Sequence, residues 1–205
     1  MSSKDLLGTL NVSRETMQRL EIFDTVIRKW NPKINLVSRS SLDLLWTRHI
    51  ADSVQVFRCV ETPCHWVDIG SGGGFPGLVV AILAADEAPQ MRITLIESDQ
   101  RKSAFLRTAA RECGASLTVI SDRIEQVDPQ KANVLSARAL ASLDDLLGFA
   151  ERHLTVDGIA VFPKGENWKK EVDKARQRWR FEMETAKSLT EPEAVILKIR
   201  GVERV

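Results

Sequence analysis

The feature that most constrains the fold is a glycine-rich run at residues 68–77, Asp-Ile-Gly-Ser-Gly-Gly-Gly-Phe-Pro-Gly. The residues just before the glycines predict a short strand, and the apolar residues after them predict a helix that tolerates Pro76 in its first turn. Gly70, Gly72 and Gly74 therefore lie where the chain must turn tightly and where a ligand can touch the backbone. The run predicts a ligand-binding loop.

Segments that predict strands and helices alternate along the rest of the chain. Strands are expected at residues 65–70, 92–98, 116–121, 132–138 and 158–165, helices at 75–85, 100–114, 142–154 and up to about 179, and a closing antiparallel pair at 180–189 and 193–200. Strands that alternate with helices favour an α/β fold with a mostly parallel sheet covered on both faces. Such sheets bind ligands beyond the carboxyl ends of their strands, so we expect the chemistry at that edge.

The N-terminal part of the chain predicts helices. Ser13 is a suitable N-cap, and Pro32 is expected to end the first helix at about Asn31. A second helical piece is expected at 41–58. Apolar residues at three- and four-residue steps support the first helix: Met17, Leu20, Phe23, Ile27 and Trp30. We therefore expect an N-terminal helical extension at 1–58 that packs on the core, followed by a domain at 59–205 that carries the chemistry.

Two acids indicate which ligand the loop binds. Asp68 stands immediately before the loop, where an acid would repel the pyrophosphate of a dinucleotide but would attract the ammonium and sulfonium groups of S-adenosylmethionine. Glu97 ends the next strand, where a carboxylate can accept hydrogen bonds from both ribose hydroxyls of a nucleoside. These positions predict a methyltransferase whose cofactor, S-adenosylmethionine, lies against Gly70 and Gly72.

The same loop leaves an alternative open. Gly72, Gly74 and Gly77 also satisfy Gly-x-Gly-x-x-Gly, the dinucleotide fingerprint, which would indicate an NAD-linked oxidoreductase. Glu97 supports nucleoside binding in both classes and does not choose between them. Asp68, together with the lack of a persuasive proton donor near the sheet edge, disfavours the oxidoreductase.

Other candidate residues follow the later strands. Ile124 and Glu125 come after the third strand and can lie beside an adenine, whereas Phe75 can pack on the ligand or on the core. Arg138 ends the fourth strand, where an arginine is costly unless it pairs with a carboxylate, a phosphate or a base, so it is the main catalytic candidate. Lys164, after the fifth strand, is a further candidate.

Composition disfavours several other kinds of protein. Cys59, Cys64 and Cys113 are odd in number and irregularly spaced, so neither a disulfide framework nor a metal site is expected. No stretch approaches the ~18 uninterrupted apolar residues of a membrane span. We expect a cytoplasmic protein without metal or membrane association, and nothing in the sequence demands more than a monomer. His49 and His153 stand in helical segments and are expected to be structural.

Three clusters of basic residues stand within a chain whose net charge is only +1. Such clusters neutralise phosphates and favour RNA as the partner, and Trp30 and Trp46 in the first cluster can stack on bases or pack in the core. A non-catalytic RNA-binding module and a methyltransferase for a small molecule or a protein remain alternatives. The clusters are Arg28, Lys29, Lys33, Arg39 and Arg48; Arg101, Lys102, Arg107 and Arg111; and the segment 168–180.

These motifs together resemble the RsmG family, also called glucose-inhibited division protein B (GidB). The resemblance covers nearly the whole chain and depends most on the Gly-Phe-Pro-Gly end of the loop and on Lys-Trp-Asn-Pro-Lys-Ile-Asn-Leu-Val-Ser. Two departures are slight, because Gly73 stands where the family usually has Ala or Pro, and Arg101-Lys102 reverses the usual order. The matching segments are 29–38, 48–53 (Arg-His-Ile-Ala-Asp-Ser), 68–77, 97–106, 123–125, 136–139 and the late Lys-Gly at 164–165.

The resemblance implies a class I methyltransferase fold, a Rossmann-like three-layer αβα sandwich. Its sheet would be mostly parallel and seven-stranded, with an antiparallel C-terminal strand, and N-terminal helices would precede it. The implied activity is methyl transfer from S-adenosylmethionine to nitrogen-7 of a specific guanine in 16S (small-subunit) ribosomal RNA. Because that nitrogen has a free lone pair and no proton, no general base is required. Cofactor contacts are implied at Gly70, Phe75, Ile124, Glu125 and Arg138.

Overall fold

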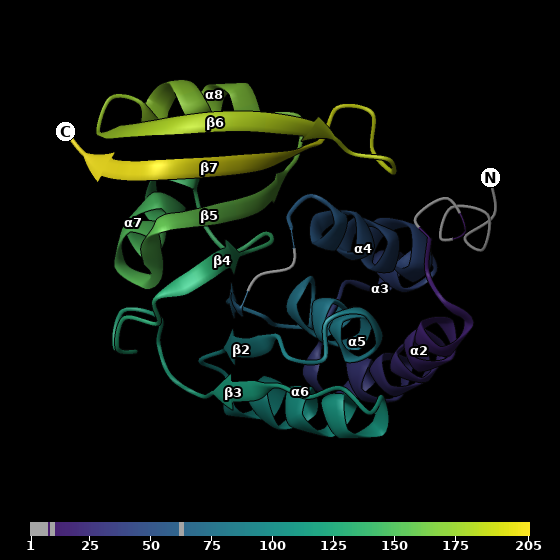
Figure 1. Cartoon of the computed structure of the whole chain (residues 1–205). Coiled ribbons are helices and arrows are strands. Elements are labelled where there is room, and N and C mark those ends of the chain that lie inside the picture. The colour runs from purple at the N-terminus through teal and green to yellow at the C-terminus, as the bar shows by residue number, and fades with distance from the viewer. Residues whose placement is uncertain (1–7, 9–10, 62–63) are drawn as a thin grey trace.

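The computed structural model of the chain describes residue 8, residues 11–61 and residues 64–205 (Figure 1). Helices lie at Arg14–Ile34 (α2), Arg39–Leu42 (α3), Ala51–Arg58 (α4), Gly77–Glu87 (α5), Gln100–Glu112 (α6), Leu143–His153 (α7) and Trp168–Ala175 (α8), and a π-helical segment lies at Trp46–Ile50 (η1). Strands lie at His65–Ile69 (β1), Arg92–Ile96 (β2), Thr118–Ile120 (β3), Ala132–Ser136 (β4), Leu154–Lys164 (β5), Trp179–Lys187 (β6) and Val195–Arg204 (β7). Residues 1–7 and 9–10 of the predicted N-terminal extension lie outside the described residues.

Seven strands form one sheet in the order β3-β2-β1-β4-β5-β7-β6. The pairs β1 with β2, β1 with β4, β2 with β3 and β4 with β5 are parallel. β7 runs antiparallel to both of its neighbours, β5 and β6, so the expected antiparallel C-terminal strand is confirmed. The strand order changes direction between β1 and β4, and ligands bind at such a switch point, beyond the carboxyl ends of the strands.

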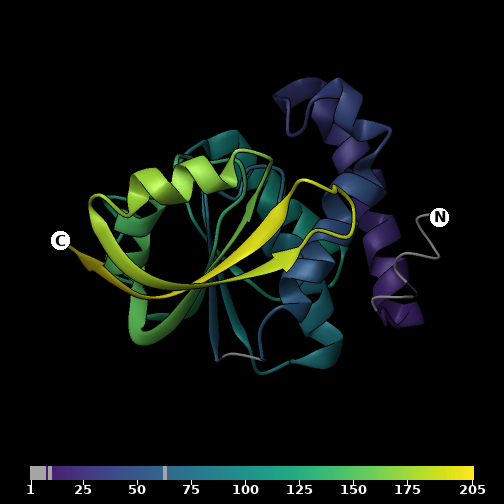
Figure 2. The same cartoon turned by 90° about the horizontal axis from the view of Figure 1, so that it is seen from above.

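Helices cover both faces of the sheet, as Figures 1 and 2 show from two directions. One apolar core joins α2, α4, α5 and α6 to the sheet and fully buries Phe23, Trp66 and Phe105. The other joins α7 and α8 to the opposite face and fully buries Leu147 and Phe162. Because β1 and β2 are covered on both sides, burial is continuous along them instead of alternating: all five residues of β1 and the last four of β2 are buried. The expected three-layer sandwich is confirmed.

The first helix, α2, begins as predicted but ends later. Ser13 caps it by accepting a hydrogen bond from the amide of Thr16 at 3.1 Å. The helix continues through Pro32 to Ile34, so the prediction that it ends at about Asn31 is wrong. Pro32 is exposed and stands in the last turn, where its missing amide removes a single hydrogen bond close to the point at which the helix ends anyway.

The second helical piece is interrupted. The sequence predicted helix over 41–58, whereas the structure has the short α3, a turn, the π-helical η1 and then α4. A π-helical turn contains one more residue than an α-helical turn and is frequent at functional sites. The extra residue rotates the side chains that follow it around the helix axis, and η1 carries Arg48 and His49.

Within the described ranges, no helix combines the length and the apolar character that crossing a membrane requires. The same part of the chain contains no group of three or more His, Cys, Asp or Glu side chains that could hold a metal ion.

Candidate active site

A cavity of about 720 Å³ opens at the carboxyl ends of β1, β2 and β4. Residues from the glycine-rich loop, from the ends of β2 and β4, from the turn after β3 and from the N-terminal region line it. The sequence-predicted residues in its wall are Gly70, Gly72, Phe75, Glu97, Ile124, Glu125 and Arg138. The fold thus brings these seven residues together from four segments that lie far apart in the sequence.

The glycine-rich loop turns sharply because its glycines adopt backbone angles that other residues disfavour. The φ angles of Gly70 and Gly72 are 62° and 51°. The amide of Gly70 donates to the carbonyl of Ile96 at 2.9 Å, and the amide of Gly72 donates to Oε2 of Glu97 at 2.8 Å. The loop is therefore fastened to the end of β2, and its backbone forms part of the cavity wall.

Glu97 lies at the end of β2 with its carboxylate held by two backbone amides. Oε2 accepts from Gly72, and Oε1 accepts from the amide of Asp99 at 2.8 Å. The residue is only 7% exposed, yet it lines the cavity. Each carboxylate oxygen has a second lone pair, so the fixed carboxylate can still accept hydrogen bonds from a ligand in the cavity.

Asp68 lies beneath the loop and is absent from the cavity wall. It is fully buried, and its Oδ1 accepts a hydrogen bond from the hydroxyl of Ser136 at 2.6 Å. Its Oδ2 faces Gly77 and has no hydrogen-bond partner of regular geometry among the described residues. Desolvation by burial raises the pKa of Asp68 to about 6, against the opposing effects of the Ser136 and Ser71 hydroxyls and the Gly77 amide. Any effect of this carboxylate on a ligand would act through the loop.

Asp68→Asn is expected to change how stability depends on pH. Because the folded-state pKa of about 6 lies above the ordinary value of 3.8, the stability that this group contributes is present below the ordinary value and is lost as pH rises through about 6. The variant lacks this loss. Its free energy of unfolding, relative to the native protein, should therefore increase between about pH 4 and about pH 7, by about 3 kcal/mol at most. Urea unfolding across that range measures the difference, and a constant difference would contradict the expectation.

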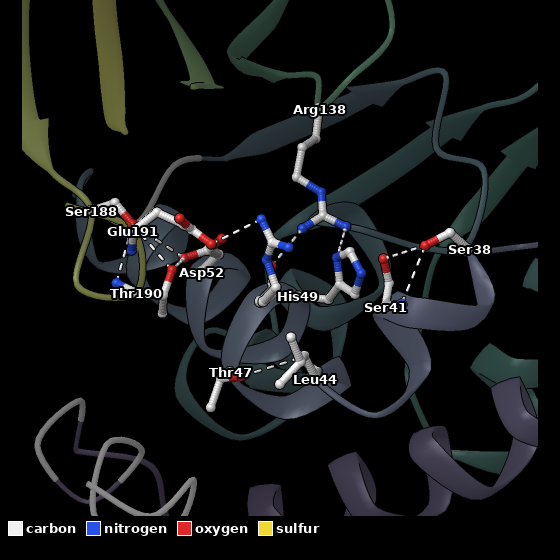
Figure 3. Close-up of polar contacts among 11 residues, drawn as sticks. Ser38, Ser41, Leu44, Thr47, His49, Asp52, Arg138, Ser188, Thr190 and Glu191 are labelled. Carbon is white, nitrogen blue, oxygen red and sulfur yellow. Dashed lines mark hydrogen bonds and ion pairs between the residues drawn. The ribbon is translucent and has the colours of Figure 1, made fainter. Parts of the chain in front are cut away.

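Arg138, just after β4, is held in place by the N-terminal region (Figure 3). Its NH1 group donates to the carbonyl of Arg48 at 3.1 Å, and its NH2 group donates to Nδ1 of His49. The guanidinium carbon lies 5.0 Å from the centroid of the Phe75 ring. Burial lowers the pKa of Arg138 to about 10, so the group stays cationic at neutral pH. No carboxylate of the described residues forms an ion pair with it.

His49 is a site residue that the sequence-based prediction missed, because a structural role was expected. Its ring stacks on Phe75 with 5.1 Å between centroids and lines the cavity. Desolvation by burial, followed by the charges of Arg138 and Arg48, lowers the pKa of His49 to about 3. Since Nδ1 accepts from Arg138, the neutral ring carries its proton on Nε2. The one sequence feature that could have indicated a site position for His49 was its place in the Arg-His-Ile-Ala-Asp-Ser segment. His153 instead is fully buried in α7, as expected of a structural residue.

The N-terminal region also supplies wall residues that were not predicted, among them Leu36 and Val37. The buried side chain of Asn31 holds this segment in place, because its Oδ1 accepts from the amides of Leu36 at 2.7 Å and Val37 at 2.9 Å. The segment lies close to the loop: a Cβ atom at Gly73 would be 3.1 Å from the carbonyl oxygen of Leu36. The spacing of apolar residues identifies the buried face of a helix but says nothing about residues beyond its end. Leu36 and Val37 could therefore not be predicted to line the cavity.

The remaining candidates have distinct positions. Phe75 packs on Phe23 with 5.3 Å between centroids and also lines the cavity, so it contacts both the core and the site. Lys164 lies in a second, adjoining cavity and not in the first. Its Nζ donates to the carbonyl of Ala141 at 3.1 Å and pairs with Glu171 at 2.8 Å.

Many of the basic residues predicted to contact RNA have partners within the chain. The ion pairs are Arg28 with Asp24, Arg48 with Glu191, Arg101 with Asp99, and Arg178 with Asp144. Trp30 packs on Phe105 at 5.8 Å, and Nε1 of Trp46 donates to Asp24 at 3.2 Å, so both tryptophans take the core-packing alternative. Exposed residues of the first cluster with no ion pair in the described ranges are Lys29, Lys33 and Arg39.

Comparison with known structures supports a methyltransferase fold. A TehB-like S-adenosylmethionine-dependent methyltransferase from Corynebacterium glutamicum superposes with a TM-score of 0.59 at 12% identity, covering 87% of this chain and 97% of that one. A variant of MtNAS in complex with S-adenosylmethionine gives a TM-score of 0.59 at 13% identity, over 89% of this chain and 71% of that one. These likenesses show that the fold is the class I methyltransferase fold.

Comparison of the sequence gives the family. A protein from a Ruegeria strain named "Ribosomal RNA small subunit methyltransferase G" is 67% identical over 196 residues, which is 96% of each chain. A protein of the same name from Cereibacter sphaeroides is 52% identical over 206 residues and the full length of both. The family model described as rRNA small subunit methyltransferase G matches residues 16–199. The protein is therefore a methyltransferase with S-adenosylmethionine as its cofactor, and the chain belongs to the rRNA small subunit methyltransferase G family (GidB, or RsmG).

Proposed function

We propose that this protein transfers the methyl group of S-adenosylmethionine to nitrogen-7 of a specific guanine in the 16S ribosomal RNA of the small subunit. The observation that carries the proposal is the position of Arg138. Its guanidinium is a fixed cation without an ion-pair partner among the described residues, and it lies between the cavity of the glycine-rich loop and a second cavity. The names of the close relatives support ribosomal RNA as the substrate.

The residues of the first cavity fit the cofactor. Its volume of about 720 Å³ lies in the range of small-molecule pockets, roughly 300–1,000 Å³. We assign the ribose hydroxyls to the carboxylate of Glu97 and the adenine to Ile124 and Glu125, while Gly70 and Gly72 let the ligand approach the backbone. The bound cofactor supplies a methyl group on a positively charged sulfur. Asp68, buried beneath the loop, adds a negative charge that favours such a ligand.

The proposed reaction is a direct in-line attack, and it needs no obligatory general base. Guanine nitrogen-7 carries a lone pair and no proton, so its attack on the methyl group releases none. His49 is suited to positioning and not to proton transfer, because its pKa is lowered to about 3 and its Nδ1 already accepts from Arg138. Alignment of nucleophile and methyl group contributes roughly 7–11 kcal/mol at best. We assign Arg138 to that alignment, which is its catalytic role.

The cofactor part of the proposal predicts a loss of affinity in Gly70→Ala. A Cβ atom there would lie 2.4 Å from Cδ1 of Leu140, a cavity-lining side chain that is 36% exposed and can move into the cavity. The φ of 62° adds a strain of about 1–2 kcal/mol. We expect the Kd for adenosylhomocysteine, measured by calorimetry, to rise at least about tenfold while the protein still melts cooperatively. An unchanged Kd would show that Leu140 does not reach the ligand.

The rival classes are separated by ligand-induced stabilisation. A ligand that binds only the folded protein raises Tm, so adenosylhomocysteine should raise it and NADH should not. The reverse result would favour an NAD-linked oxidoreductase. A non-catalytic RNA-binding module would bind small-subunit RNA with an affinity that adenosylmethionine does not change, and it would transfer no methyl group.

The position of the methyl group needs its own experiment. Ribosomal RNA labelled by the protein with radioactive adenosylmethionine is digested to nucleosides, and the label should co-migrate with 7-methylguanosine. Label in another methylated nucleoside would leave the methyltransferase intact and contradict nitrogen-7 as the target. Digestion of RNA incubated without the protein is the control.

A further inference from the structure

A second cavity of about 500 Å³ adjoins the first. The two share Ser41, His49, Arg138, Ala139 and Ala141, so the Arg138 guanidinium stands between them. The second cavity lies beyond the carboxyl end of β5 and is closed on one side by the turn between β6 and β7 and by the first two residues of β7. Its size and its contact with the cofactor cavity suit an acceptor base taken out of its stack.

Three carboxylates line this cavity, and two of them are already paired. Glu171 pairs with Lys164 at 2.8 Å, and Glu191 pairs with Arg48 at 2.8 Å. Asp52 alone among the three forms no ion pair with any described residue. Two hydroxyls and the nearby charge of Arg138 compensate the partly buried anion in part, and a donor that fills the cavity would add to this compensation.

The two oxygens of Asp52 have different surroundings (Figure 3). Oδ1 accepts from the hydroxyls of Ser188, at 3.5 Å, and Thr190, and so holds the turn between β6 and β7. No hydrogen bond to Oδ2 is formed by the residues that the structure describes. Burial raises the pKa of Asp52, with the Thr190 hydroxyl and the charge of Arg138 opposing that effect. One oxygen is therefore structural and the other remains available.

Guanine offers the donors that such an oxygen would accept. Its N1–H and its 2-amino group are on the six-membered ring, on the side away from nitrogen-7. Adenine instead presents an acceptor at N1 and no amino group at C2. A base with nitrogen-7 toward the cofactor cavity would point its Watson–Crick edge away from that cavity, into the second one. A single carboxylate there separates guanine from adenine by accepting hydrogen bonds that adenine cannot donate.

We propose that the second cavity binds the acceptor guanine and that Asp52 recognises its N1–H and 2-amino group. This inference rests on the proposed function and adds the residue that selects the base. It also gives a role to the Arg-His-Ile-Ala-Asp-Ser segment: Arg48 and His49 hold Arg138, and Asp52 reads the guanine from the other side of the same cavity.

The test compares Asp52→Asn with Thr190→Val. Asparagine keeps the shape and can still accept from Thr190, but it turns an amino group, itself a donor, toward the donors of guanine. Valine at 190 removes the hydroxyl that Asp52 holds and leaves the carboxylate, so it reports the structural role alone. Both variants are checked by thermal melting before use.

The binding experiment uses protein saturated with adenosylhomocysteine, so that the first cavity is filled, and titrates GMP, IMP and AMP by NMR. The native protein and Thr190→Val should bind GMP about tenfold more tightly than IMP, which lacks the 2-amino group, and AMP more weakly than either. In Asp52→Asn the preference for GMP over IMP should disappear. No preference in the native protein, or an undiminished preference in Asp52→Asn, would overturn the proposal.

Methyl transfer to unmodified small ribosomal subunits under single-turnover conditions separates this inference from the proposed function. The rate at subsaturating subunits should fall about 100-fold in Asp52→Asn and less than about threefold in Thr190→Val. If the native protein methylates guanine and Asp52→Asn does so equally well, the role of Asp52 is wrong and the function stands. If the native protein transfers no methyl group, the proposed function itself fails.

Discussion

Arg138→Ala is expected to lose methyl transfer almost completely while the fold persists. The guanidinium is fixed by the Arg48 carbonyl and His49 between the two cavities, with no carboxylate pair in the described part of the chain to satisfy its charge. Two charge-assisted hydrogen bonds to the reactants, each worth about 1.5 kcal/mol or more, correspond to a fall in kcat/KM of at least about 100-fold. Steady-state transfer to unmodified subunits measures it.

Two further variants make this result specific. Arg138→Lys keeps the charge but loses the planar fork that reaches the Arg48 carbonyl and His49 together, so its activity should be intermediate. Arg200→Ala is the matched control. Arg200 lies in β7 beside the amino-terminal half of β5, away from the carboxyl ends of the strands, and donates to the carbonyl of Asp157 at 3.1 Å. It should keep native activity. Native turnover in Arg138→Ala, with a native melting curve, would remove Arg138 from the site.

Gly77→Ala is expected to destabilise the fold, although replacing glycine by alanine usually stabilises a helix. A Cβ atom at Gly77 would lie 2.4 Å from Cδ2 of Leu95 and 2.6 Å from Cβ of Asp68. Both neighbours are fully buried, so neither can move aside cheaply. Replacing a glycine by alanine in a helix interior gains about 1 kcal/mol of helix propensity, and the gain is smaller at Gly77 because it is the first residue of α5, whereas overpacking costs about 1–3 kcal/mol or more. Because both contacts are this short, the cost of overpacking should exceed the gain in helix propensity, and the free energy of unfolding should fall by about 2 kcal/mol.

Gly148→Ala in α7 is the matched control for that prediction. Gly148 lies in the interior of α7, where alanine brings the full gain in helix propensity, and its Cβ atom would meet Trp179 at 3.8 Å, which is ordinary contact. Urea unfolding should therefore show Gly148→Ala to be more stable than the native protein by about 0.5–1 kcal/mol. Destabilisation of both variants by similar amounts would mean that the contacts beneath the loop do not decide the effect.

The strands and the loop could be predicted because they depend on local rules. The short, mostly apolar segments that form β1, β2 and β4, and the glycines between β1 and α5, have few other ways to fold. The same runs could not show which way each side chain faces, because every residue of β1 is buried. For this reason Asp68 was predicted at the ligand, whereas the structure places it beneath the loop. The position of Asp68 beneath the loop depends on contacts across the sheet, such as the hydrogen bond from Ser136 of β4, which the sequence alone does not show.

The parts of the site that were missed depend on contacts between distant segments. Arg138 could be predicted from the cost of an unpaired arginine at a strand end. Its partners could not, because the π-helical turn of η1 breaks the 3.6-residue period on which helix predictions depend. The turn brings His49 against an arginine 89 positions later in the chain. Asp52 of α4 contacts Thr190 across 138 positions, a separation over which helix periodicity gives no information.

Transfer of radiolabelled methyl from adenosylmethionine is the experiment that decides whether the protein methylates a guanine of the small-subunit RNA. The acceptors are small ribosomal subunits from a strain that lacks the gene, with subunits from the wild-type strain and free RNA alongside. Label should enter only the unmodified subunits or their RNA, and strand cleavage specific for 7-methylguanosine should release it at one position. No incorporation by protein that binds adenosylhomocysteine tightly would contradict the claim and leave only the fold and the cofactor.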